Sequence, residues 1–301
     1  MARAPLTGYL LLAGISLFWG LNWPAMKVGL AEIPVWWFRV ISLAGGSVGL
    51  LGITWAVTGR VLPHRAELGQ LAVCTVFIVL GWHICAAYGV SMIPAGRAAI
   101  IAYLMPVFAA ILAVPVLGER MTGAKALGLV LGLAGLAVLI GPDLAVLRTA
   151  PIGALFMVGA ASSWALGTVL FKRFRWQSSV AIVTGWQLAL GLLVLVPVAI
   201  ATEPVPDPAA LSAEVWIAIV YLVALPMIFC QWAYLKVVTI FPAAVAAIGT
   251  LAVPVVGVYS SAILLGEPVG WAEFTALILI SAALVVVLVV PALVPARPKP
   301  G

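Results

Sequence analysis

Charged residues are scarce in this chain. Lys, Arg, Asp and Glu make up only 8% of its 301 residues, whereas hydrophobic residues make up 65%. Soluble proteins carry roughly 25% charged and 45–50% apolar residues, so a soluble fold would lack polar surface here. Ten membrane spans of about 20 residues would use about 200 residues and leave the rest for ends and loops. The composition therefore excludes a soluble protein and predicts an integral membrane protein that crosses the bilayer many times.

Cysteine and nucleotide-binding motifs are also scarce or missing. Cys74, Cys85 and Cys230 lie inside apolar runs without C-x-x-C spacing, which excludes a disulfide framework and a zinc site. No phosphate-binding G-x-x-x-x-G-K-[ST] and no H-E-x-x-H motif occurs, which argues against an ATP-driven mechanism and a zinc enzyme. The net charge of +6 is explained by cytoplasmic loops, so it does not indicate a nucleic-acid partner. We expect no cofactor and no metal.

Apolar runs broken by proline, glycine and charge clusters predict an all-α integral membrane protein with ten transmembrane helices. The predicted spans cover residues 8–27, 35–57, 68–91, 95–117, 123–141, 152–172, 179–201, 213–236, 242–265 and 271–291. The first span is too long for a signal peptide and no A-x-A cleavage site follows it, so we expect it to stay in the mature protein. Residues 292–301 would form a cytoplasmic tail.

Basic residues predict the orientation of these spans. With ten spans both termini share one side of the membrane, and that side would hold eleven of the 15 basic residues. The eleven are Arg3, Arg60, Arg65, Arg120, Lys125, Lys172, Arg173, Arg175, Lys236, Arg297 and Lys299. Cytoplasmic loops are enriched in Lys and Arg, so both termini should lie in the cytoplasm, with the protein in a bacterial-type inner membrane. Seven of the nine acidic residues would lie on the outer side.

Residues of the first half recur in the second half at a nearly constant spacing. The pairs are Trp19 with Trp164 and Lys27 with Lys172, 145 residues apart, and Pro94 with Pro242, Pro106 with Pro254 and Glu119 with Glu267, 148 apart. Two copies of five helices explain this spacing, and because five is odd the second copy must lie upside down. We therefore predict two inverted repeats, residues 1–145 and 146–291. Inverted repeats are typical of transporters that bind their substrate near the membrane midplane.

Five short motifs follow one another in order along the chain. They are FWGLNWPAMK at residues 18–27, Ile33-Pro34 with Arg39, LGER at 117–120, TGWQ at 184–187 and LGEP at 265–268. Together they resemble the EamA-type drug/metabolite transporter superfamily over nearly the whole chain. The resemblance implies ten helices, a central cavity between two inverted repeats, and movement of small organic solutes, often export. His83 and the aromatic residues are most similar to those of bacterial aromatic amino-acid and methyl viologen exporters.

Polar side chains inside the spans are the first candidates for substrate binding, because burying them in hydrocarbon is costly. His83 is the one imidazole, carboxylate or ammonium group that we place deep in a predicted span. It could bind an amino or carboxylate group, couple transport to protons through a charge change between about pH 5 and 8, or simply bond to another helix. Asn22, Gln231 and, less strongly, Gln187 are neutral donors and acceptors that suit a zwitterion, or alternatively join helices to one another.

Aromatic residues inside the spans are the second set of candidates. Those expected to line the cavity are Trp19, Tyr103, Trp164, Trp186 and Tyr234. Such rings can stack on a planar solute or hold an organic cation, and the alternative is ordinary packing. Trp82 adjoins His83, so it should point about 100° away around the helix and face another helix or lipid. Tryptophans at span ends, such as Trp271, are expected in the interfacial belts.

Other residues indicate where helices bend, where they pack closely and where charge gathers. Pro106 and Pro254 occupy matching places in the two copies and are predicted to act as hinges for gating. Glycines 45, 49 and 52 are predicted to let helices approach closely. Lys27, Arg39 and Arg97 gather at the outer side, where they could attract a carboxylate, although snorkelling to the interface is the interpretation we favour there.

The sequence therefore predicts a secondary transporter rather than an enzyme. Its expected activity is export, by alternating access, of small flat amphipathic solutes such as aromatic amino acids or cationic drugs. A passive channel and an exporter of other metabolites remain alternatives. An intramembrane enzyme is remote, because no Asp lies within a predicted span, although Ser162 or Ser163 could approach His83. The expected partners are the lipid bilayer and the solute, with facilitated diffusion or weak proton coupling, in a monomer or homodimer.

Overall fold

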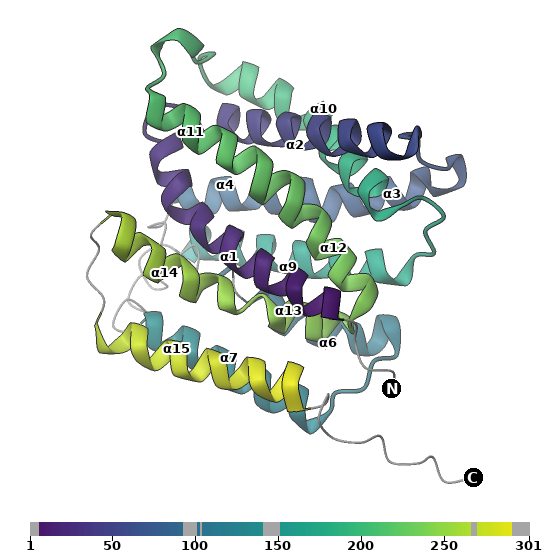
Figure 1. Ribbon diagram of the computed structural model, residues 1–301, viewed down its shortest axis with the longest axis vertical. Coiled ribbons are helices and arrows are strands. Elements are labelled where there is room, and N and C mark those ends of the chain that lie inside the picture. Colours follow the sequence, from purple (N-terminus) through teal and green to yellow (C-terminus); the bar gives the residue numbers. More distant parts are fainter. Residues whose placement is uncertain (1–5, 93–100, 103, 141–150, 266–269, 291–301) are drawn as a thin grey trace.

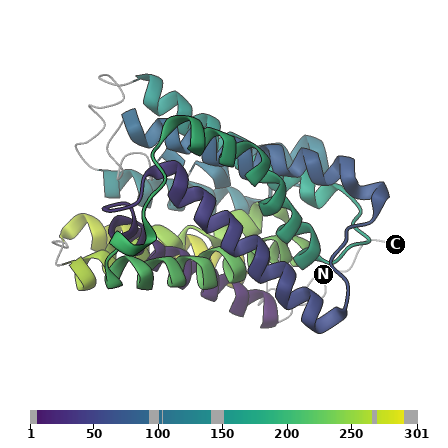
Figure 2. The same cartoon turned by 90° about the horizontal axis from the view of Figure 1, so that it is seen from above.

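The computed structural model describes a bundle of helices. The described residues are 6–92, 101–102, 104–140, 151–265 and 270–290, and no strand occurs within these ranges. The helices lie side by side with their axes roughly along one direction, as the two views show (Figures 1 and 2). Their arrangement confirms the all-helical class.

Helices of the first part of the chain run up and down in turn. They are α1 (Leu6–Gly29), α2 (Val35–Thr58), η1 (Arg65–Glu67), α3 (Leu68–Cys74), η2 (Thr75–Gly81), α4 (Trp82–Met92), α6 (Met105–Leu117) and α7 (Gly123–Ile140). The segments η1, α3, η2 and α4 follow without a break and form one long helix, within which η2 is π-helical.

Helices of the second part follow a similar order. They are α9 (Pro151–Arg173), α10 (Val180–Thr202), η4 (Pro208–Ala210), α11 (Ala213–Leu222), η5 (Val223–Cys230), α12 (Gln231–Ile240), α13 (Ala243–Gly249), α14 (Ala252–Leu265), α15 (Trp271–Leu284) and η6 (Val285–Val289). Here α11, η5 and α12 form one long helix with η5 π-helical. The predicted span 242–265 is instead divided into α13 and α14 by Thr250 and Leu251.

Length and exposure identify membrane helices. Among the described residues, seven helices are long and apolar enough to cross a membrane, and three further apolar helices are shorter, at Met105–Leu117, Gly123–Gly135 and Leu277–Val287. Large apolar side chains stand exposed along them, for example Ile263 at 82% and Leu155 at 70%. A water-soluble protein rarely exposes so much contiguous apolar surface, whereas lipid favours it. The chain is a multi-pass membrane protein.

Charged residues of the described chain gather at the two ends of the bundle. One end, which we call the basic end, holds the connections after α2, α6, α9 and α12, with Arg60, Arg65, Arg120, Lys125, Lys172, Arg173, Arg175 and Lys236. The other, which we call the acidic end, holds the connections after α1 and α10 and the start of α11, with Glu32, Glu203, Asp207 and Glu214. This separation follows the charge bias of the sequence.

Glycines set the close approach between helices. A Cβ atom added at Gly45 would lie 2.7 Å from Val223, and one added at Gly49 would lie 2.2 Å from Ile228, so both allow the predicted close approach, and the partner is η5. A Cβ atom added at Gly52 would have no heavy atom of a neighbouring helix within 4 Å, so the prediction that Gly52 packs against a helix is wrong. Gly52 lies about one turn beyond Gly49, past the contact of α2 with η5, and it is exposed.

Gly167 offers a direct test of this packing. A Cβ atom there would lie 2.4 Å from the Ile78 side chain and 3.0 Å from the Ile78 backbone nitrogen, which cannot turn aside. Because this forces α9 and η2 apart, Gly167→Ala should destabilise the protein by about 1–3 kcal/mol. Gly52→Ala is the matched control and should leave the melting temperature in detergent unchanged or slightly raised. Equal melting of the two variants would contradict the packing described here.

Candidate functional site

Four aromatic side chains from four helices meet in the middle of the bundle. Trp164 on α9 lies with its ring centroid 6.0 Å from that of Trp19, 5.4 Å from Trp82 and 5.6 Å from Tyr234. Trp19 and Tyr234 also contact each other, at 5.6 Å. We call these four residues the aromatic cluster. Rings at such separations attract one another through edge-to-face and tilted contacts.

Depth along the helices places the cluster centrally. Trp19 follows Leu6, the start of α1, by 13 residues, and Trp164 follows Pro151, the start of α9, by the same number. At 1.5 Å per residue each ring is roughly 20 Å from its helix start. The Tyr234 hydroxyl lies 3.2 Å from the Thr168 hydroxyl, which fixes the phenol inside an apolar surrounding. Trp82, which the sequence set apart from the lining rings as facing another helix or lipid, joins the cluster through its contact with Trp164.

His83 and Gln231 occupy matching places in two long helices. Each is buried, at 2% and 7% exposure, and each comes one or two residues after a π-helical segment, η2 or η5. A π-helical turn contains an extra residue and frequently occurs at functional sites. The Nδ1 atom of His83 is buried and bonds to no described residue.

The remaining predicted polar and aromatic residues separate into different regions. Asn22 donates a hydrogen bond to Met26 Sδ at 3.0 Å, and its Oδ1 atom is buried without a partner among described residues. Trp186 lies near the basic end, where its Nε1 donates to the Val61 carbonyl at 2.6 Å. The structure therefore does not bring Trp186 to the aromatic cluster. Tyr103 lies outside the described residues.

The two predicted hinge prolines follow similar interruptions. Pro106 is in the first turn of α6, directly after the turn at Leu104. Pro254 is in the first turn of α14, directly after the break at Thr250 and Leu251. A proline fits the first turn because its missing N–H has no partner there in any case. Both prolines thus lie in the first turn of a helix, and Pro254 follows the break between α13 and α14.

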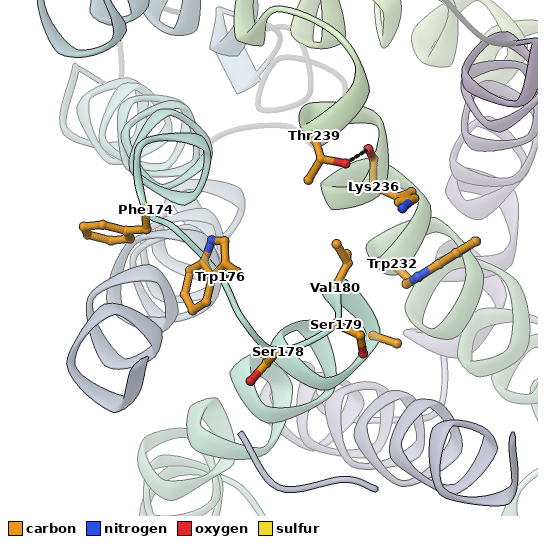
Figure 3. Close-up of a pocket in the computed structure, with 9 residues that line it drawn as sticks. Phe174, Trp176, Ser178, Ser179, Val180, Trp232, Lys236 and Thr239 are labelled. Carbon is orange, nitrogen blue, oxygen red and sulfur yellow. Dashed lines mark hydrogen bonds between the residues drawn. The ribbon is translucent and has the colours of Figure 1, made fainter. Parts of the chain in front are cut away.

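A pocket opens at the basic end beside α12 (Figure 3). Its volume is about 460 Å³. It is lined by Phe174, Trp176, Ser178, Ser179, Val180, Ala181, Trp232, Lys236 and Thr239. Aromatic rings, hydroxyls and one ammonium group thus surround a space within the size range of small-molecule sites. The sequence did not predict this pocket, because its walls come from the α9–α10 connection and from α12.

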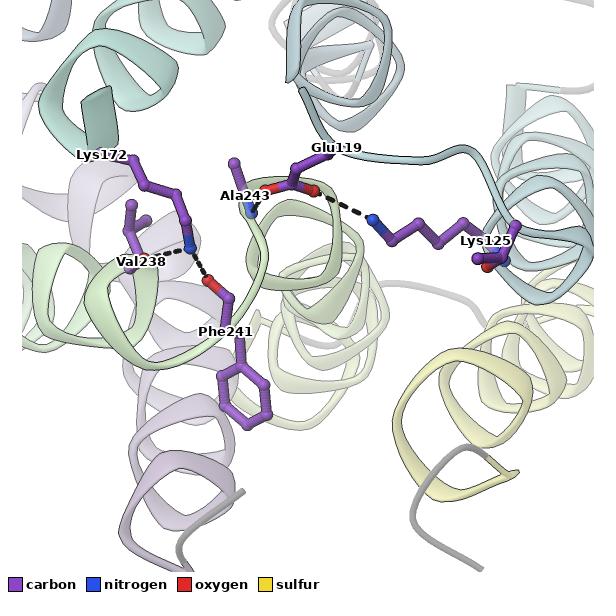
Figure 4. A network of polar contacts seen from close by, with 7 residues as sticks. Glu119, Lys125, Lys172, Val238, Phe241 and Ala243 are labelled. Atoms are coloured by element: carbon purple, nitrogen blue, oxygen red, sulfur yellow. Dashed lines mark hydrogen bonds and ion pairs between the residues drawn. The ribbon is translucent and has the colours of Figure 1, made fainter. Parts of the chain in front are cut away.

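Lys172 closes a gap in the hydrogen bonding of α12 (Figure 4). The Val238 carbonyl would normally accept from the residue four positions on, but that residue is Pro242, which has no N–H. The Lys172 ammonium donates to this carbonyl at 2.9 Å and also to the Phe241 carbonyl. The side chain thereby joins the end of α9 to the end of α12.

Carboxylates at the basic end bind backbone N–H groups of distant helices. Glu119 accepts from the Ala243 N–H at 2.8 Å and pairs with Lys125 at 3.0 Å (Figure 4). Glu67 accepts from the Ser178 hydroxyl at 2.5 Å and from the Gln177 and Ser178 N–H groups. These contacts fix the starts of α13 and α10.

The acidic end has the same kind of contact. Glu32 accepts from the Ser212 N–H at 2.8 Å, and Glu203 accepts from Trp36 N–H at 2.8 Å and Trp37 N–H at 3.3 Å. The hydrogen bonds from Ser212 hold the pKa of the exposed Glu32 carboxyl below its usual value. Sequence reasoning placed these acids only by side of the membrane and missed their partners. Among the described residues no group of three or more His, Cys, Asp and Glu side chains could hold a metal ion.

Comparisons with known proteins identify this multi-pass membrane protein as a transporter. The model of the EamA-like transporter family matches residues 6–141 and again residues 151–289. The chain therefore belongs to this family, in the drug/metabolite transporter superfamily.

Individual relatives agree with this assignment. The chain is 30% identical to the uncharacterized transporter YvbV of Bacillus subtilis (strain 168), over 90% of this chain and 88% of that protein. It is 26% identical to a probable amino-acid metabolite efflux pump of Escherichia coli (strain K12), over 90% and 91%. A crystal structure with 20% sequence identity superposes with a TM-score of 0.83, covering 95% of this chain and 99% of that one. This last similarity shows the fold alone.

Lys172 leads to a prediction about stability. Replacing it in Lys172→Met leaves two helix-terminal carbonyls without their donor, and an unsatisfied buried polar group costs about 1–3 kcal/mol. The melting temperature in detergent should fall accordingly. Lys236→Met removes an exposed ammonium from the same end and should change melting little. A Lys172→Met protein as stable as Lys236→Met would refute the role assigned to Lys172.

Proposed function

We propose that this protein is a secondary transporter that exports small amphipathic organic solutes, with aromatic amino acids as its best substrates. The observation that carries the proposal is the aromatic cluster at mid-depth, with buried neutral polar groups on the helices around it. Rings supply a flat apolar surface, and amide and imidazole atoms supply hydrogen bonds for a zwitterion. The relative named an amino-acid metabolite efflux pump agrees with this substrate class.

We further propose ten spans in two inverted repeats. Helix bounds support the duplication, because α9 begins 145 residues after α1 and α10 begins 145 residues after α2. The π-helical η5 begins 148 residues after η2, and α15 begins 148 residues after α7. The match of the family model to each half separately supports it too. Equivalent helices run in opposite directions between the basic and acidic ends, as inversion requires.

Alternating access is the proposed mode of movement. The interrupted helices at Pro106 and Pro254 and the π-helical segments are places where the bundle can bend. Polar contacts gather at the two ends, whereas the described middle is joined mainly by apolar and aromatic packing. Opening one end while the other stays bonded would expose the aromatic cluster to one side at a time. A passive channel would instead need a continuous pore lined by charges or carbonyls.

The pocket at the basic end is the proposed intake for solute. It lies where the positive-inside rule places the cytoplasm. Trp232 lines the pocket on α12, and Tyr234 of the aromatic cluster lies two residues further along the same helix. Because residues two apart on a helix point to nearly opposite sides, solute would have to pass around α12 to move from this pocket to the cluster. Because no carboxylate of the described residues contacts the cluster, we propose facilitated diffusion or weak proton coupling through His83.

Transport in proteoliposomes tests the function. Labelled tryptophan should enter vesicles saturably, and Trp164→Ala should raise the half-saturation concentration about tenfold, because one ring contact contributes about 0.5–1.5 kcal/mol beyond its buried area. Trp271→Ala, whose indole is 75% exposed, is the matched control and should behave as wild type. Flux that does not saturate would favour the channel. Vesicles that take up no aromatic amino acid faster than empty liposomes would overturn the proposed substrate class.

Orientation can be tested with single cysteines. In a Cys85→Ala background the remaining Cys74 and Cys230 are buried. A membrane-impermeant maleimide added to intact cells should label Val205→Cys at the acidic end and should label Arg60→Cys at the basic end only after the membrane is permeabilised. The opposite pattern would place both termini outside.

A further inference from the structure

The pocket at the basic end is bounded by two walls from different parts of the chain. Figure 3 shows Trp176 of the α9–α10 connection on one side of it and Trp232 and Lys236 of α12 on the other. Together with Thr239, the two α12 residues follow one another at spacings of four and three, so all three side chains share one face of that helix. Tyr234 of the aromatic cluster lies on the opposite side of α12. The helix therefore presents one face to the pocket and another to the cluster.

Trp176 is a fixed part of the pocket wall. Its Nε1 atom donates to the Phe171 carbonyl at 2.8 Å, and its ring stacks on that of Phe171 with the centroids 5.3 Å apart and the planes at 27°. Phe174 contacts the same indole edge-on at 6.1 Å. On the other wall the ring of Trp232 lies 6.3 Å from that of Phe229. Rings that are already held in place offer apolar surface to a solute with little further loss of side-chain freedom on binding.

Lys236 supplies the charge of the pocket. It is the one charged residue among those that line the pocket, and its ammonium forms no hydrogen bond or ion pair with any described residue. Glu67 lies behind Ser178, but it is only 2% exposed, and its carboxylate is already bound to the Ser178 hydroxyl and to two backbone N–H groups. Arg173 and Arg175 stand exposed beside the pocket and add positive charge. The charge that faces the pocket is therefore positive and is not neutralised by the described protein.

The ammonium lies nearer the mouth of the pocket than the α12 indole does. Because α12 ends at Ile240, at the basic end, Lys236 lies roughly 6 Å further toward that end than Trp232, at 1.5 Å per residue. A solute whose ring lies against the indoles can therefore extend a charged group outward to the ammonium. This arrangement attracts an apolar body that carries an anionic group and repels one that carries only a cation.

We infer that this pocket selects solutes by their carboxylate, which Lys236 binds while the indole of Trp232 or Trp176 contacts the ring. An anionic phospholipid shares this chemistry, since it joins a phosphate to an apolar chain. The volume of about 460 Å³ and the rings on both walls favour a small planar solute over an acyl chain. The inference rests on the proposed intake of amphipathic solutes and adds that aromatic acids bind more tightly there than aromatic amines.

Two indole compounds measure this selection on the purified protein. 3-Indolepropionate carries a carboxylate and tryptamine an ammonium, and the affinity of each is measured by calorimetry in an uncharged detergent. Wild-type protein should bind 3-indolepropionate more tightly. Lys236→Gln should weaken that binding about three- to tenfold, a modest effect because an ion pair with an exposed ammonium is partly screened by water. The same variant should bind tryptamine more tightly than wild type does, because a like charge has been removed.

Matched variants separate charge recognition from a structural role. Lys236→Arg keeps the charge and should keep the preference for the acid. Arg60→Gln removes an exposed charge of the basic end that does not line the pocket, and it should change neither affinity. Equal affinities for the two compounds in the wild type, or an equal loss of both in Lys236→Gln, would overturn the subsite.

Nanodiscs test the lipid as the occupant. The preference for 3-indolepropionate should persist in nanodiscs of phosphatidylcholine and in nanodiscs that contain phosphatidylglycerol. Binding that is lost only in the presence of phosphatidylglycerol would assign the pocket to an anionic lipid and reject the solute subsite.

Transport distinguishes failure of the subsite from failure of the proposed function. Saturable tryptophan uptake with the same half-saturation concentration in wild type and Lys236→Gln would reject the subsite and leave the proposed function intact. A preference for 3-indolepropionate that depends on Lys236, in a protein whose proteoliposomes transport no aromatic amino acid, would support the subsite and reject only the proposed substrate.

Discussion

The backbone N–H groups at helix starts have no partner within their own helix. This constraint organises the ends of the bundle. Four carboxylates meet it, each by reaching from one half of the chain to the other: Glu32 to Ser212, Glu67 to Ser178, Glu119 to Ala243 and Glu203 to Trp36. Both ends are thereby braced by charge-assisted hydrogen bonds, while the middle depends on packing of rings and apolar groups. A bundle built in this way is strongest at its ends and most adaptable where a solute would bind.

Much of this architecture was predictable from hydropathy. The predicted span 35–57 corresponds to α2, Val35–Thr58, because a long apolar run in lipid can satisfy its backbone only as a helix. The break within 242–265 was missed, since no charge or glycine cluster marks Thr250 and Leu251. The π-helical segments were missed as well, because a change from i+4 to i+5 bonding leaves no periodic signal in a uniformly apolar run.

The residues of the candidate site were also predictable only in part. Trp19, Trp164 and Tyr234 were predictable as inward-facing rings at mid-depth. Trp186 was predicted with them, but it lies only six residues after the start of α10, where its indole bonds to a connection at the basic end. Arg39 lies near the start of α2 with its side chain partly exposed and its Nε atom buried, so snorkelling stays a prediction for this residue.

The π-helical segments have a consequence for how the long helices tolerate length changes. Each residue of a helix turns the chain by about 100°, so the extra residue in η2 sets the rotational phase of everything beyond it, including His83. Loss of one residue from Thr75–Gly81 would turn the Trp82–Met92 segment by that angle and carry His83 out of its buried position. The same holds for η5 with Gln231 and Tyr234. In these two helices the number of residues, more than their identity, determines which side chains face the interior.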